Sequence, residues 1–507
     1  MSPEVGWDDV VVGAGSAGAT LAARLSEQTG RRVLLIEAGP DRSGTDSAPE
    51  QLGRPTLSGL NWAYETADGE RPVPYRVGRV VGGSSAVNGA IALRGLPADF
   101  DEWAAAGNPE WAWWKVLPYF VRMETDHDVT GPEHGDRGPV PIRRLTATTP
   151  ISDAFVDACR QQGLPPVADL NGNPTPGVGP LPTNSRHGRR MGTAETYLAA
   201  ARGRPNLTVW PDTTALRLLG DGPRVTGLEV RRDGRTVRVR ADRVTLSAGA
   251  VNTPLLLQRS GIGPAERLAA LGVRPWVDLP GVGANLSDHP LLGIWAVPRA
   301  GLCRAGDPWH SVVARAASDG VDPDLMVFLN CNVSPEDVPT LGPMLRGRPG
   351  VSVAVMLMST DSRGTVRLRD AAPDSPPEIR LHLAREPRDE QRLMTGTRLI
   401  WSLLRAPAMG GLLERVLLWT DRMVAEEPLL RRAVRTFVAP SWHPTGTARM
   451  GPADDRGAVV DQFLRVHGVD GLRVVDASVL PAVPRATPNL TCVMLGERAA
   501  DWMSEIQ

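Results

Sequence analysis

Three glycines near the N-terminus have the spacing that a dinucleotide-binding turn requires. Gly13, Gly15 and Gly18 form a GxGxxG pattern that encloses Ser16 and Ala17. The first glycine permits a tight turn, the second lets a pyrophosphate approach the backbone, and the third lets a helix pack against a strand. The free N–H groups at the start of that helix would then bind the phosphates. The pattern predicts a site for the pyrophosphate of a dinucleotide.

The segments on either side of this pattern complete a strand–turn–helix–strand unit. Residues 9–12 and 32–36 are short apolar runs typical of buried parallel strands, and residues 19–28 have apolar side chains at helical spacing. The second run ends at Glu37, next to Ala38, where a carboxylate can bind a ribose diol and disfavours a 2′-phosphate. The unit predicts a dinucleotide site and argues against NADP, but it does not distinguish FAD from NAD.

The length and composition of the chain indicate a soluble protein with two domains. A chain of 507 residues exceeds the size at which a single hydrophobic core stops growing. Its 42% hydrophobic and 22% charged residues are typical of soluble globular proteins. The net charge of −1 gives no reason to expect a nucleic acid or an acidic membrane surface as a partner.

Neither the cysteines nor the N-terminus indicates a metal site, a secreted protein or a membrane anchor. The four cysteines form no CxxC pair and no zinc-ligand cluster, so we expect no metal. Residues 1–9 lack the apolar region of a signal peptide, and no apolar stretch reaches the length of about 18 residues that a membrane helix needs. We expect a cytoplasmic protein, and the sequence does not indicate its oligomeric state.

Further apolar runs along the chain predict an α/β fold with two sheets. A hairpin layer attached to the nucleotide domain is predicted from residues 207–210, 215–219, 226–231, 236–240 and 243–247. A second, mostly antiparallel sheet is predicted from residues 292–297, 324–330, 351–358 and 365–369. Helices are predicted at residues 387–404, 427–436 and 491–503, a last buried strand at 472–476, and a surface loop at 164–182.

Four longer motifs follow the nucleotide unit along the chain. They are residues 78–88 (GRVVGGSSAVN), 249–263 (GAVNTPLLLQRSGIG), 442–451 (WHPTGTARMG) and 475–481 (VDASVLP), the last followed by 488–490 (PNL). In this order they resemble the signatures of the glucose–methanol–choline (GMC) oxidoreductases. Within that family, the sequence is most similar to the branch of the aryl-alcohol and 5-hydroxymethylfurfural oxidases. The motifs are long and span nearly the whole chain.

The resemblance implies that the dinucleotide is FAD. It places a group of residues along the pyrophosphate and the flavin, namely Val81, Gly82, Gly83, Ser85, Asn88, Gly89, Ala90 and Ile91. It places Asp476 and Ala477 near the ribityl chain, Leu490 beside the cofactor, and Trp62 and Ala215 near the adenine. Some members attach the flavin covalently through a histidine just before the Asn88 position. That position is Val87 here, so noncovalent FAD is expected.

The resemblance also implies the domain organisation. We expect a Rossmann-like FAD-binding domain with the βαβ fingerprint and a substrate domain built on a mostly antiparallel sheet. The FAD-binding domain is discontinuous because its elements occur at both ends and in the middle of the chain, and it is predicted to comprise residues 1–40, 76–98, 205–300 and 455–507. The substrate-binding domain and its lid segments are predicted to comprise residues 41–75, 99–204 and 301–454.

Oxidation of an alcohol needs a base for the hydroxyl proton and an acceptor for the α-hydride, which in this family is flavin N5. Neutral imidazole is the usual base, and of the eight histidines only His443 lies in the family's active-site motif. The partner position is Asn489, whose amide can bind the substrate oxygen and stabilise developing negative charge. Trp442 is expected either to form a wall of the substrate pocket or to pack in the core. For His289 and His310 we expect structural roles.

These residues predict an FAD-dependent alcohol oxidase or dehydrogenase whose substrate is a primary aryl or allylic alcohol. A choline-type substrate has less support because no cation site is recognisable. One alternative is an alcohol dehydrogenase that acts on a larger natural product and uses an acceptor other than oxygen. Another is a lyase of the hydroxynitrile type, which has the same fold and keeps the flavin but performs no redox step. The sequence does not identify the alcohol, the electron acceptor or the lid.

Overall fold

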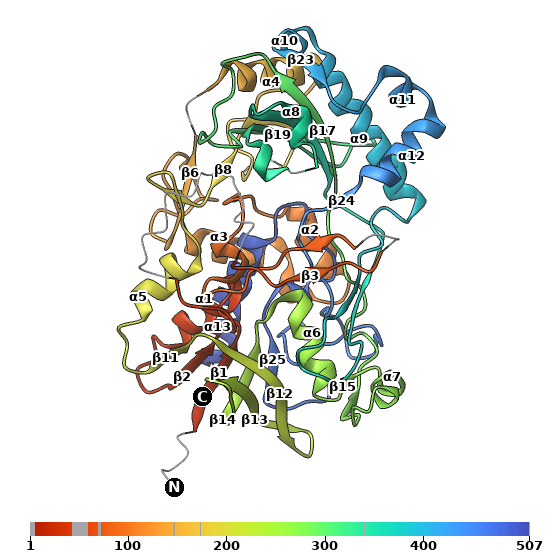
Figure 1. The fold of residues 1–507 in the computed structure, drawn as a ribbon. Helices are drawn as coiled ribbons and strands as arrows, with labels where there is room; N and C mark the ends of the chain where they lie inside the picture. The colour runs from red at the N-terminus through yellow and green to blue at the C-terminus, as the bar shows by residue number, and fades with distance from the viewer. Residues whose placement is uncertain are drawn as a thin grey trace.

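A computed structural model describes residues 6–42, 59–68, 72–145, 148–172, 174–338 and 340–505. Its two large sheets lie at opposite ends of an elongated molecule, and the strands of the first sheet lie in the lower half of Figure 1. Both chain termini lie at the end that contains the first sheet. Among the described residues, no helix has the length and apolar character needed to span a bilayer.

The first sheet has seven strands and joins segments from the start, the middle and the end of the chain. Its order is β11-β2-β1-β14-β13-β12, and β25 also pairs with β14. The parallel strands are β1 (Trp7–Val12), β2 (Val33–Ile36), β11 (Leu207–Trp210), β14 (Arg235–Leu246) and β25 (Leu472–Val474). The antiparallel strands β12 (Thr213–Asp221) and β13 (Arg224–Arg232) extend β14 as the predicted hairpin layer.

Two helices from opposite ends of the chain pack together beside this sheet. Helix α1 (Ser16–Leu25) starts directly after the glycine turn, and α13 (Asn489–Glu505) starts at the predicted partner of the base. Between them, Arg24 donates hydrogen bonds to the fully buried carboxylate of Glu497 at 2.9 to 3.1 Å. The contact joins the C-terminal end of α1 to the middle of α13.

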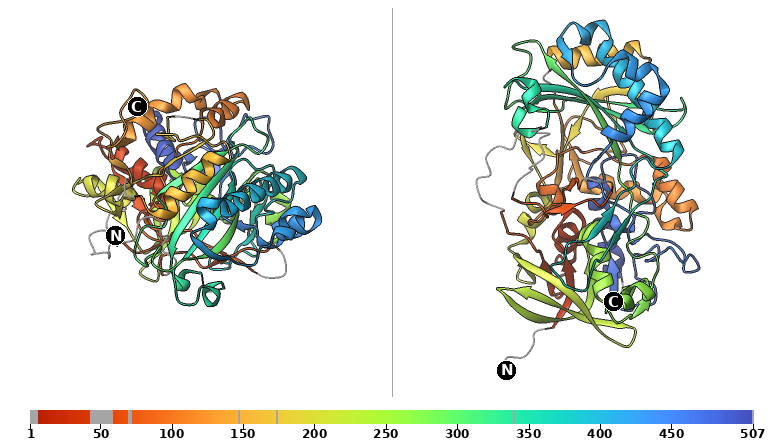
Figure 2. Two further views of the ribbon diagram at one scale, coloured as in Figure 1. Left: turned by 90° about the horizontal axis from the view of Figure 1, so that it is seen from above. Right: turned by 45° about the vertical axis from the view of Figure 1, so that its right-hand side comes forward.

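The second sheet is antiparallel and is built mainly from the region after residue 290. Its order is β23-β17-β20-β19-β18-β7, with β24 paired to β17. The strands are β7 (Gly177–Pro180), β17 (Pro290–Pro298), β18 (Val312–Ala316), β19 (Leu325–Val333), β20 (Gly350–Leu357), β23 (Leu413–Val416) and β24 (Ala439–Pro440). Helix α9 (Pro387–Arg405) packs on β20. Helix α12 (Glu427–Phe437) packs on α9, and Figure 2 shows this group along one side of the molecule.

The remaining elements are short and connect or cover the two sheets. The helices are α2 (Pro97–Ala105), α3 (Trp113–Met123), α4 (Pro150–Gln161), α5 (Ala199–Ala201), α6 (Gly249–Arg259), α7 (Ala265–Ala270), α8 (Gly342–Leu345), α10 (Pro407–Gly410) and α11 (Asp421–Ala425). The strands are β3 (Tyr64–Glu65), β4 (Pro74–Tyr75), β5 (Glu124–Asp126), β6 (Val140–Arg144), β8 (Pro182–Thr183), β9 (Ser185–Arg186), β10 (Arg189–Arg190), β15 (Ile262–Gly263), β16 (Val277–Asp278), β21 (Thr365–Arg367) and β22 (Glu378–Arg380).

The structure confirms an α/β fold with a parallel sheet and an antiparallel sheet, and it corrects several elements. Residues 236–240 and 243–247 belong to one continuous strand, β14. Residues 365–369 do not extend the second sheet, because β21 pairs with β22 in a separate hairpin. The loop predicted at 164–182 contains the buried strand β7 at the edge of the second sheet.

The chain crosses from the first sheet to the second earlier than we predicted. Strand β17 lies inside the range 205–300 that was assigned to the FAD-binding domain. It is nevertheless an inner strand of the second sheet, with β20 on one side and β23 and β24 on the other. The crossing between the sheets therefore lies before residue 290. The other domain boundaries stay predictions, and part of segment 41–75 lies outside the described residues.

Candidate active site

A cavity of about 450 Å³ is lined by residues from both sheets and from the loops between them. Most of the residues predicted from the sequence to bind the cofactor line this central cavity: Gly13, Gly15, Ser16, Ala17, Glu37, Ala38, Trp62, Gly83, Asn88, Gly89, Ile91, Ala215, Asp476 and Ala477. His443, Asn489 and Trp442 line it too. The structure therefore brings residues from near both ends of the chain together in one cavity.

Six of the predicted cofactor residues lie behind the cavity wall: Gly18, Val81, Gly82, Ser85, Ala90 and Leu490. Several of them hold the wall in place. The Ser85 hydroxyl donates to the Gly82 carbonyl at 2.6 Å, and the backbone N–H of Val81 donates to the carbonyl of Pro40 at 3.0 Å. Their place in the fold indicates support of the residues that face the cavity.

The glycine turn has the geometry that its sequence predicts. Gly13 has a φ of +104°, a conformation that side-chain-bearing residues rarely adopt. A Cβ atom on Gly18 would lie 2.0 Å from the carbonyl oxygen of Gly13 and 2.8 Å from Cβ of Ser247. The close packing of strand, turn and helix therefore requires glycine at both positions. Helix α1 begins at Ser16 with its first N–H groups beside the cavity.

The carboxylate of Glu37 is fixed at the end of β2. Its Oε2 accepts a hydrogen bond from the N–H of Ala14 at 3.0 Å, and its Oε1 accepts one from the N–H of Gly39 at 2.9 Å. Burial raises the pKa of Glu37 to about 7, although these N–H groups oppose the shift. Each oxygen keeps a lone pair that a ribose hydroxyl in the cavity can use.

Asp476 is held by four donors from the protein. Its Oδ2 accepts from the N–H of Gly249 at 2.9 Å and from the hydroxyl of Thr253 at 2.6 Å. Its Oδ1 accepts from the N–H of Ser478 at 2.8 Å and from its hydroxyl at 2.5 Å. The carboxylate therefore ties α6 to the segment after β25, and it fixes the neighbouring Ala477 at the cavity.

Two further predicted residues have contacts that define the nucleotide end of the cavity. Trp62 stacks on Tyr64 with 5.6 Å between ring centroids, and the guanidinium of Arg79 lies 4.8 Å from the Trp62 ring. On the other side, the Asn88 side chain accepts a hydrogen bond from the N–H of Ala90 at 2.9 Å. The carbonyl of Asn88 accepts one from the guanidinium of Arg190, a residue that the sequence analysis did not assign to the site.

His443 lies against a second histidine, His289. Their Nδ1 atoms are 2.9 Å apart, and the two rings are nearly perpendicular, at 83°. His289 is fully buried, and its Nε2 lies 3.0 Å from the carbonyl oxygen of Pro484. His443 is partly accessible and lines the central cavity. The structural role expected for His289 thus includes a direct contact with the predicted base.

Burial makes both histidines weak bases in the folded protein. It lowers the pKa of His443 well below the usual 6.5, and the neighbouring His289 lowers it further. Burial lowers the pKa of His289 to about 4, although the carbonyl groups of Pro484 and Met358 oppose the shift. Both rings are therefore neutral at pH 7, and neutral imidazole is the form that can accept a proton.

The backbone of His443 is fixed by the residue before His289. The N–H of His443 donates to Oδ1 of Asp288 at 3.0 Å, and the hydroxyl of Tyr75 donates to Oδ2 of the same carboxylate at 2.6 Å. Asp288 and Tyr75 are both buried. Burial raises the pKa of Asp288 to about 6, while its hydrogen bonds favour the charged form. These hydrogen bonds anchor the main chain of His443 to the buried carboxylate of Asp288.

Asn489 faces the cavity from the start of α13. Its Oδ1 accepts a hydrogen bond from the hydroxyl of Ser16, at 2.8 Å. With the oxygen bound to the nucleotide turn, the amide N–H groups remain to donate into the cavity. This orientation is compatible with the predicted contact to a substrate oxygen.

The end of the cavity next to the second sheet is largely aromatic and apolar. Its lining residues include Leu291, Trp309, His310, Phe328, Asn330, Ala354, Met356 and Trp442. Trp442 also packs against the apolar cluster of Val251, Leu255 and Leu286, so it both lines the cavity and contacts the core. The others could not be assigned to the site from the sequence because they lie on separate strands and a loop, with no local motif. His310, for which only a structural role was expected, lies edge-on to Phe328, with 6.0 Å between ring centroids.

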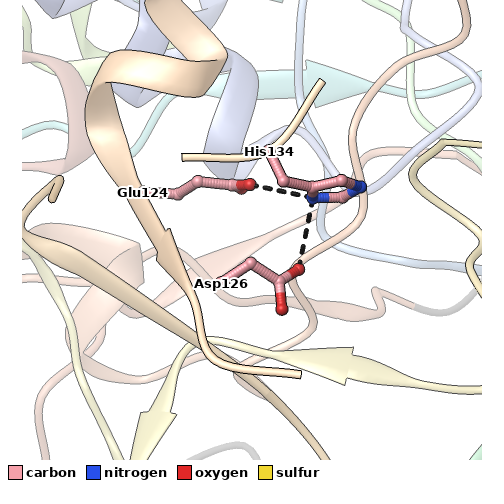
Figure 3. A group of neighbouring side chains, drawn as sticks. All are labelled: Glu124, Asp126 and His134. Carbon is pink, nitrogen blue, oxygen red and sulfur yellow. Dashed lines mark hydrogen bonds and ion pairs between the residues drawn. The ribbon is translucent and has the colours of Figure 1, made fainter. Parts of the chain in front are cut away.

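Among the residues that the structure describes, one group of side chains has the spacing to hold a metal ion. Glu124, Asp126 and His134 offer ligand atoms within 4.8 Å of one another (Figure 3). Hydrogen bonds to Asp126, Asp169 and Glu124 raise the pKa of His134 to about 11, so at neutral pH the ring is protonated and donates to these carboxylates.

Two arginines complete this group as an ion network. Arg144 pairs with Asp126 at 2.8 Å and with Asp169 at 2.7 Å, and Arg94 pairs with Glu124. The three carboxylates are therefore balanced by two guanidinium groups and one imidazolium. We interpret the group as a buried ion network that joins β5 and β6 to the loop at residue 169.

A parallel sheet with a nucleotide turn, joined to an antiparallel sheet across a cavity with a neutral histidine, defines a dinucleotide-dependent oxidoreductase. Residues 7–291 and 360–496 match the N-terminal and C-terminal sequence profiles of GMC oxidoreductases. The chain belongs to the GMC oxidoreductase family, and it is an FAD-dependent oxidoreductase that acts on the CH–OH groups of alcohols.

Relatives with known activities match the chain over nearly its whole length. It is 38% identical to the 5-(hydroxymethyl)furfural oxidase of Methylovorus sp., over 98% of both chains. It is 34% identical to the oxygen-dependent choline dehydrogenase of Rhizobium etli, over 97% of this chain and 95% of the relative. The crystal structure of pyridoxine 4-oxidase from Mesorbium loti superposes with a TM-score of 0.90 at 32% identity, covering 99% of this chain and 100% of that one.

Proposed function

We propose that the protein oxidises a primary aryl or allylic alcohol to the aldehyde. His443 takes the hydroxyl proton, and FAD supplies the acceptor, at flavin N5, for the hydride of the α-carbon. The proposal depends on one observation: the neutral imidazole of His443 lines the same cavity as a group of aromatic side chains from the region of the second sheet. General-base catalysis needs such a group within reach of the proton.

The charge of the cavity lining disfavours a cationic substrate, because Arg76 and Arg259 also line the cavity. Among the described lining residues, the acids are Glu37 and Asp476, and both carboxylates are bound by N–H or hydroxyl groups at the nucleotide end. A quaternary ammonium substrate would be favoured by a free carboxylate close to its charge, and both acids of the lining are already bound by protein groups. Trp309, Phe328 and Trp442 provide an apolar surface on which an aromatic ring can pack.

Two relatives act on substrates that fit this description. One is named as an oxidase of 5-(hydroxymethyl)furfural and another as a 4-oxidase of pyridoxine, and both substrates are aromatic rings with a hydroxymethyl group. The choline dehydrogenase of Rhizobium etli, at 34% identity, lies between these two relatives. We place an aryl carbinol before choline because the cavity lining is aromatic at the end next to the second sheet.

The lining supports a bound, noncovalent FAD and a second polar contact to the substrate. Val87 lines the cavity and offers no nucleophile for a covalent bond to the flavin. We expect the Asn489 amide, whose oxygen is already bound by Ser16, to donate to the substrate oxygen as negative charge develops there. We predict that Glu37 binds the ribose hydroxyls, that the start of α1 binds the pyrophosphate and that Ala477 lies by the ribityl chain.

An anaerobic screen of alcohols tests the substrate class. The purified yellow protein is mixed with 5-(hydroxymethyl)furfural, benzyl alcohol, an allylic alcohol or choline without oxygen, and flavin absorbance is followed. We expect bleaching by the aryl and allylic alcohols and little by choline. Bleaching by choline alone would overturn the proposal, and cyanohydrin cleavage without bleaching would indicate the lyase reaction.

The same screen under air addresses the electron acceptor. We infer that the alcohol is oxidised in the same way whether oxygen, a quinone or a carrier protein then reoxidises the flavin. Hydrogen peroxide formed in proportion to aldehyde identifies oxygen. Aldehyde formed only when an artificial quinone is added identifies a dehydrogenase, which is the arrangement expected of a natural-product alcohol dehydrogenase.

A further inference from the structure

The contact between His289 and His443 allows each ring proton to be assigned. The carbonyl oxygen of Pro484 can only accept, so the Nε2 atom of His289, 3.0 Å away, must carry a proton. Burial keeps the His289 pKa at about 4, so the ring is neutral at pH 7 and carries no second proton. Its Nδ1 is therefore a bare acceptor that faces His443.

The proton on His443 follows from the same geometry. Two bare nitrogens at 2.9 Å would repel each other, so Nδ1 of His443 must donate to Nδ1 of His289. The His443 ring is neutral as well, because burial and His289 both lower its pKa. Its only proton is thus on Nδ1, and its Nε2 has the free lone pair.

We propose that His289 is a positioning residue that fixes the tautomer of His443, so that the basic Nε2 is kept free for a hydroxyl group in the central cavity. The proposal rests on the proposed function only in naming that hydroxyl as the substrate alcohol. The chain of contacts runs from the Pro484 carbonyl through His289 to His443, and no exposed group takes part in it. In the other tautomer, His443 would present an N–H to the cavity and could accept no proton there.

His289 also acts once the proton has moved. When Nε2 of His443 takes the hydroxyl proton, the ring becomes an imidazolium whose Nδ1–H still donates to His289. A hydrogen bond from a charged donor is about twice as strong as a neutral one, so neutral His289 stabilises the protonated base. His289 opposes protonation of His443 only in acid, where His289 is itself charged. The proton stays on His443, because its transfer to His289 would charge a fully buried ring.

A pair of substitutions at residue 289 separates this role from simple packing. His289→Asn keeps an acceptor near the position of Nδ1, whereas His289→Leu fills similar space and accepts nothing. His467→Leu is a matched control, because His467 also bonds to a backbone carbonyl, that of Gly451 at 3.1 Å, but does not line the cavity. All three variants are compared as FAD-loaded full-length protein.

The direct readout is the tautomer of His443, which does not depend on any substrate. Protein with ¹⁵N-labelled histidine is examined by NMR at pH 8, and the signals of residue 443 are identified by their loss in His443→Ala. We expect a protonated Nδ1 and a bare Nε2 in the wild type and in His289→Asn. We expect the Nε2–H form to become populated in His289→Leu.

The second readout is the rate constant of flavin reduction by the alcohol found in the screen. We expect His289→Leu to lower it at least about tenfold, and at most by the 10²- to 10⁴-fold that a general base contributes. His289→Asn and His467→Leu should keep most of the rate. The two proposals fail separately, because a wild type that oxidises no alcohol refutes the function and leaves the tautomer measurable.

Two results would overturn the role of His289. One is a wild-type protein whose His443 carries its proton on Nε2. This NMR measurement on the wild type tests the proposal even if His289→Leu does not fold. The other is a folded His289→Leu variant that has the wild-type tautomer and the wild-type rate of flavin reduction. Equal slowing of the asparagine and leucine variants with unchanged tautomers would assign His289 to packing alone and would also overturn the proposal.

Discussion

Replacing His443 by alanine should stop alcohol oxidation without releasing FAD. The substitution removes the imidazole but keeps the backbone N–H that donates to Asp288 at 3.0 Å, so the main chain stays anchored. The ring already lines the cavity, and water can fill the space that it leaves. The hydrogen bonds that hold the carboxylate of Glu37 and the start of α1 do not involve the His443 side chain. The fold and the cofactor site should therefore survive.

The size of the effect follows from the role of a base. General-base catalysis contributes about 10²- to 10⁴-fold, which at 1.36 kcal/mol for each factor of ten corresponds to about 2.7 to 5.4 kcal/mol. The loss should lie within this range, because a water molecule that fills the space left by the imidazole is a much weaker base than imidazole. The change should affect the rate constant of flavin reduction at saturating alcohol.

Anaerobic stopped-flow measurement of flavin absorbance tests this expectation. Added imidazole should partly restore the rate of His443→Ala, in proportion to the concentration of its neutral form, because the missing side chain leaves a space of the same shape. A matched absorbance spectrum of the variant and the wild type confirms that FAD is bound. Flavin reduction by the variant at the wild-type rate would remove His443 from the reaction.

Four further outcomes test other parts of the argument. Because burial and His289 lower the pKa of His443, the rate of flavin reduction should be flat from about pH 7 to 9 and should fall only in acid, below the usual histidine pKa of about 6.5; a controlling group above pH 7 in a stopped-flow profile would contradict this. Asn489→Ala should be slower but active, and an unchanged rate would argue against its contact with the substrate oxygen. Gly18→Ala should lower FAD content measured by absorbance, because the added Cβ meets the Gly13 carbonyl at 2.0 Å, whereas Gly30→Ala, with open space around it, should not. His134→Leu should lower the free energy of unfolding in urea at pH 7 by about 3 to 5 kcal/mol, as breaking a buried ion pair does. Since the pKa of His134 in the folded protein is raised to about 11, the difference from wild type should be complete below about pH 6.5 and should shrink as the pH rises towards 11. A pH-independent difference would refute the network.

The clearest elements in the sequence are the buried parallel strands. Strands β1 and β2 are apolar runs because both faces of a parallel sheet are covered, so their positions are visible in the sequence. Strand β18 was missed because its run is interrupted by Arg315, a buried arginine that donates to the Leu170 carbonyl at 3.1 Å. A charged residue that is paired inside the protein has the same appearance in the sequence as one at the surface.

The site was predictable where its residues are neighbours in the chain and not where strands bring them together. The nucleotide turn and the His443 motif are local patterns. His289 lies 154 residues before His443, and the two meet because β17 pairs with β24, with Pro290 opposite Pro440. The aromatic end of the cavity comes from the second sheet and a loop, so no spacing along the chain indicates it.

The pairing that joins the two histidines also fixes the base relative to the cofactor site. Ser287 and Thr445 exchange backbone hydrogen bonds of 3.0 and 2.9 Å, just beyond the two histidines. One residue further, the N–H of Gly446 donates at 3.0 Å to the carbonyl of Ala477, which lines the cavity where the ribityl chain is expected. Backbone pairing therefore sets the position of the His443 main chain relative to Ala477, where we expect the ribityl chain of the flavin. Hydride and proton transfer from one carbinol require such a fixed position, because both bonds must be within reach at once.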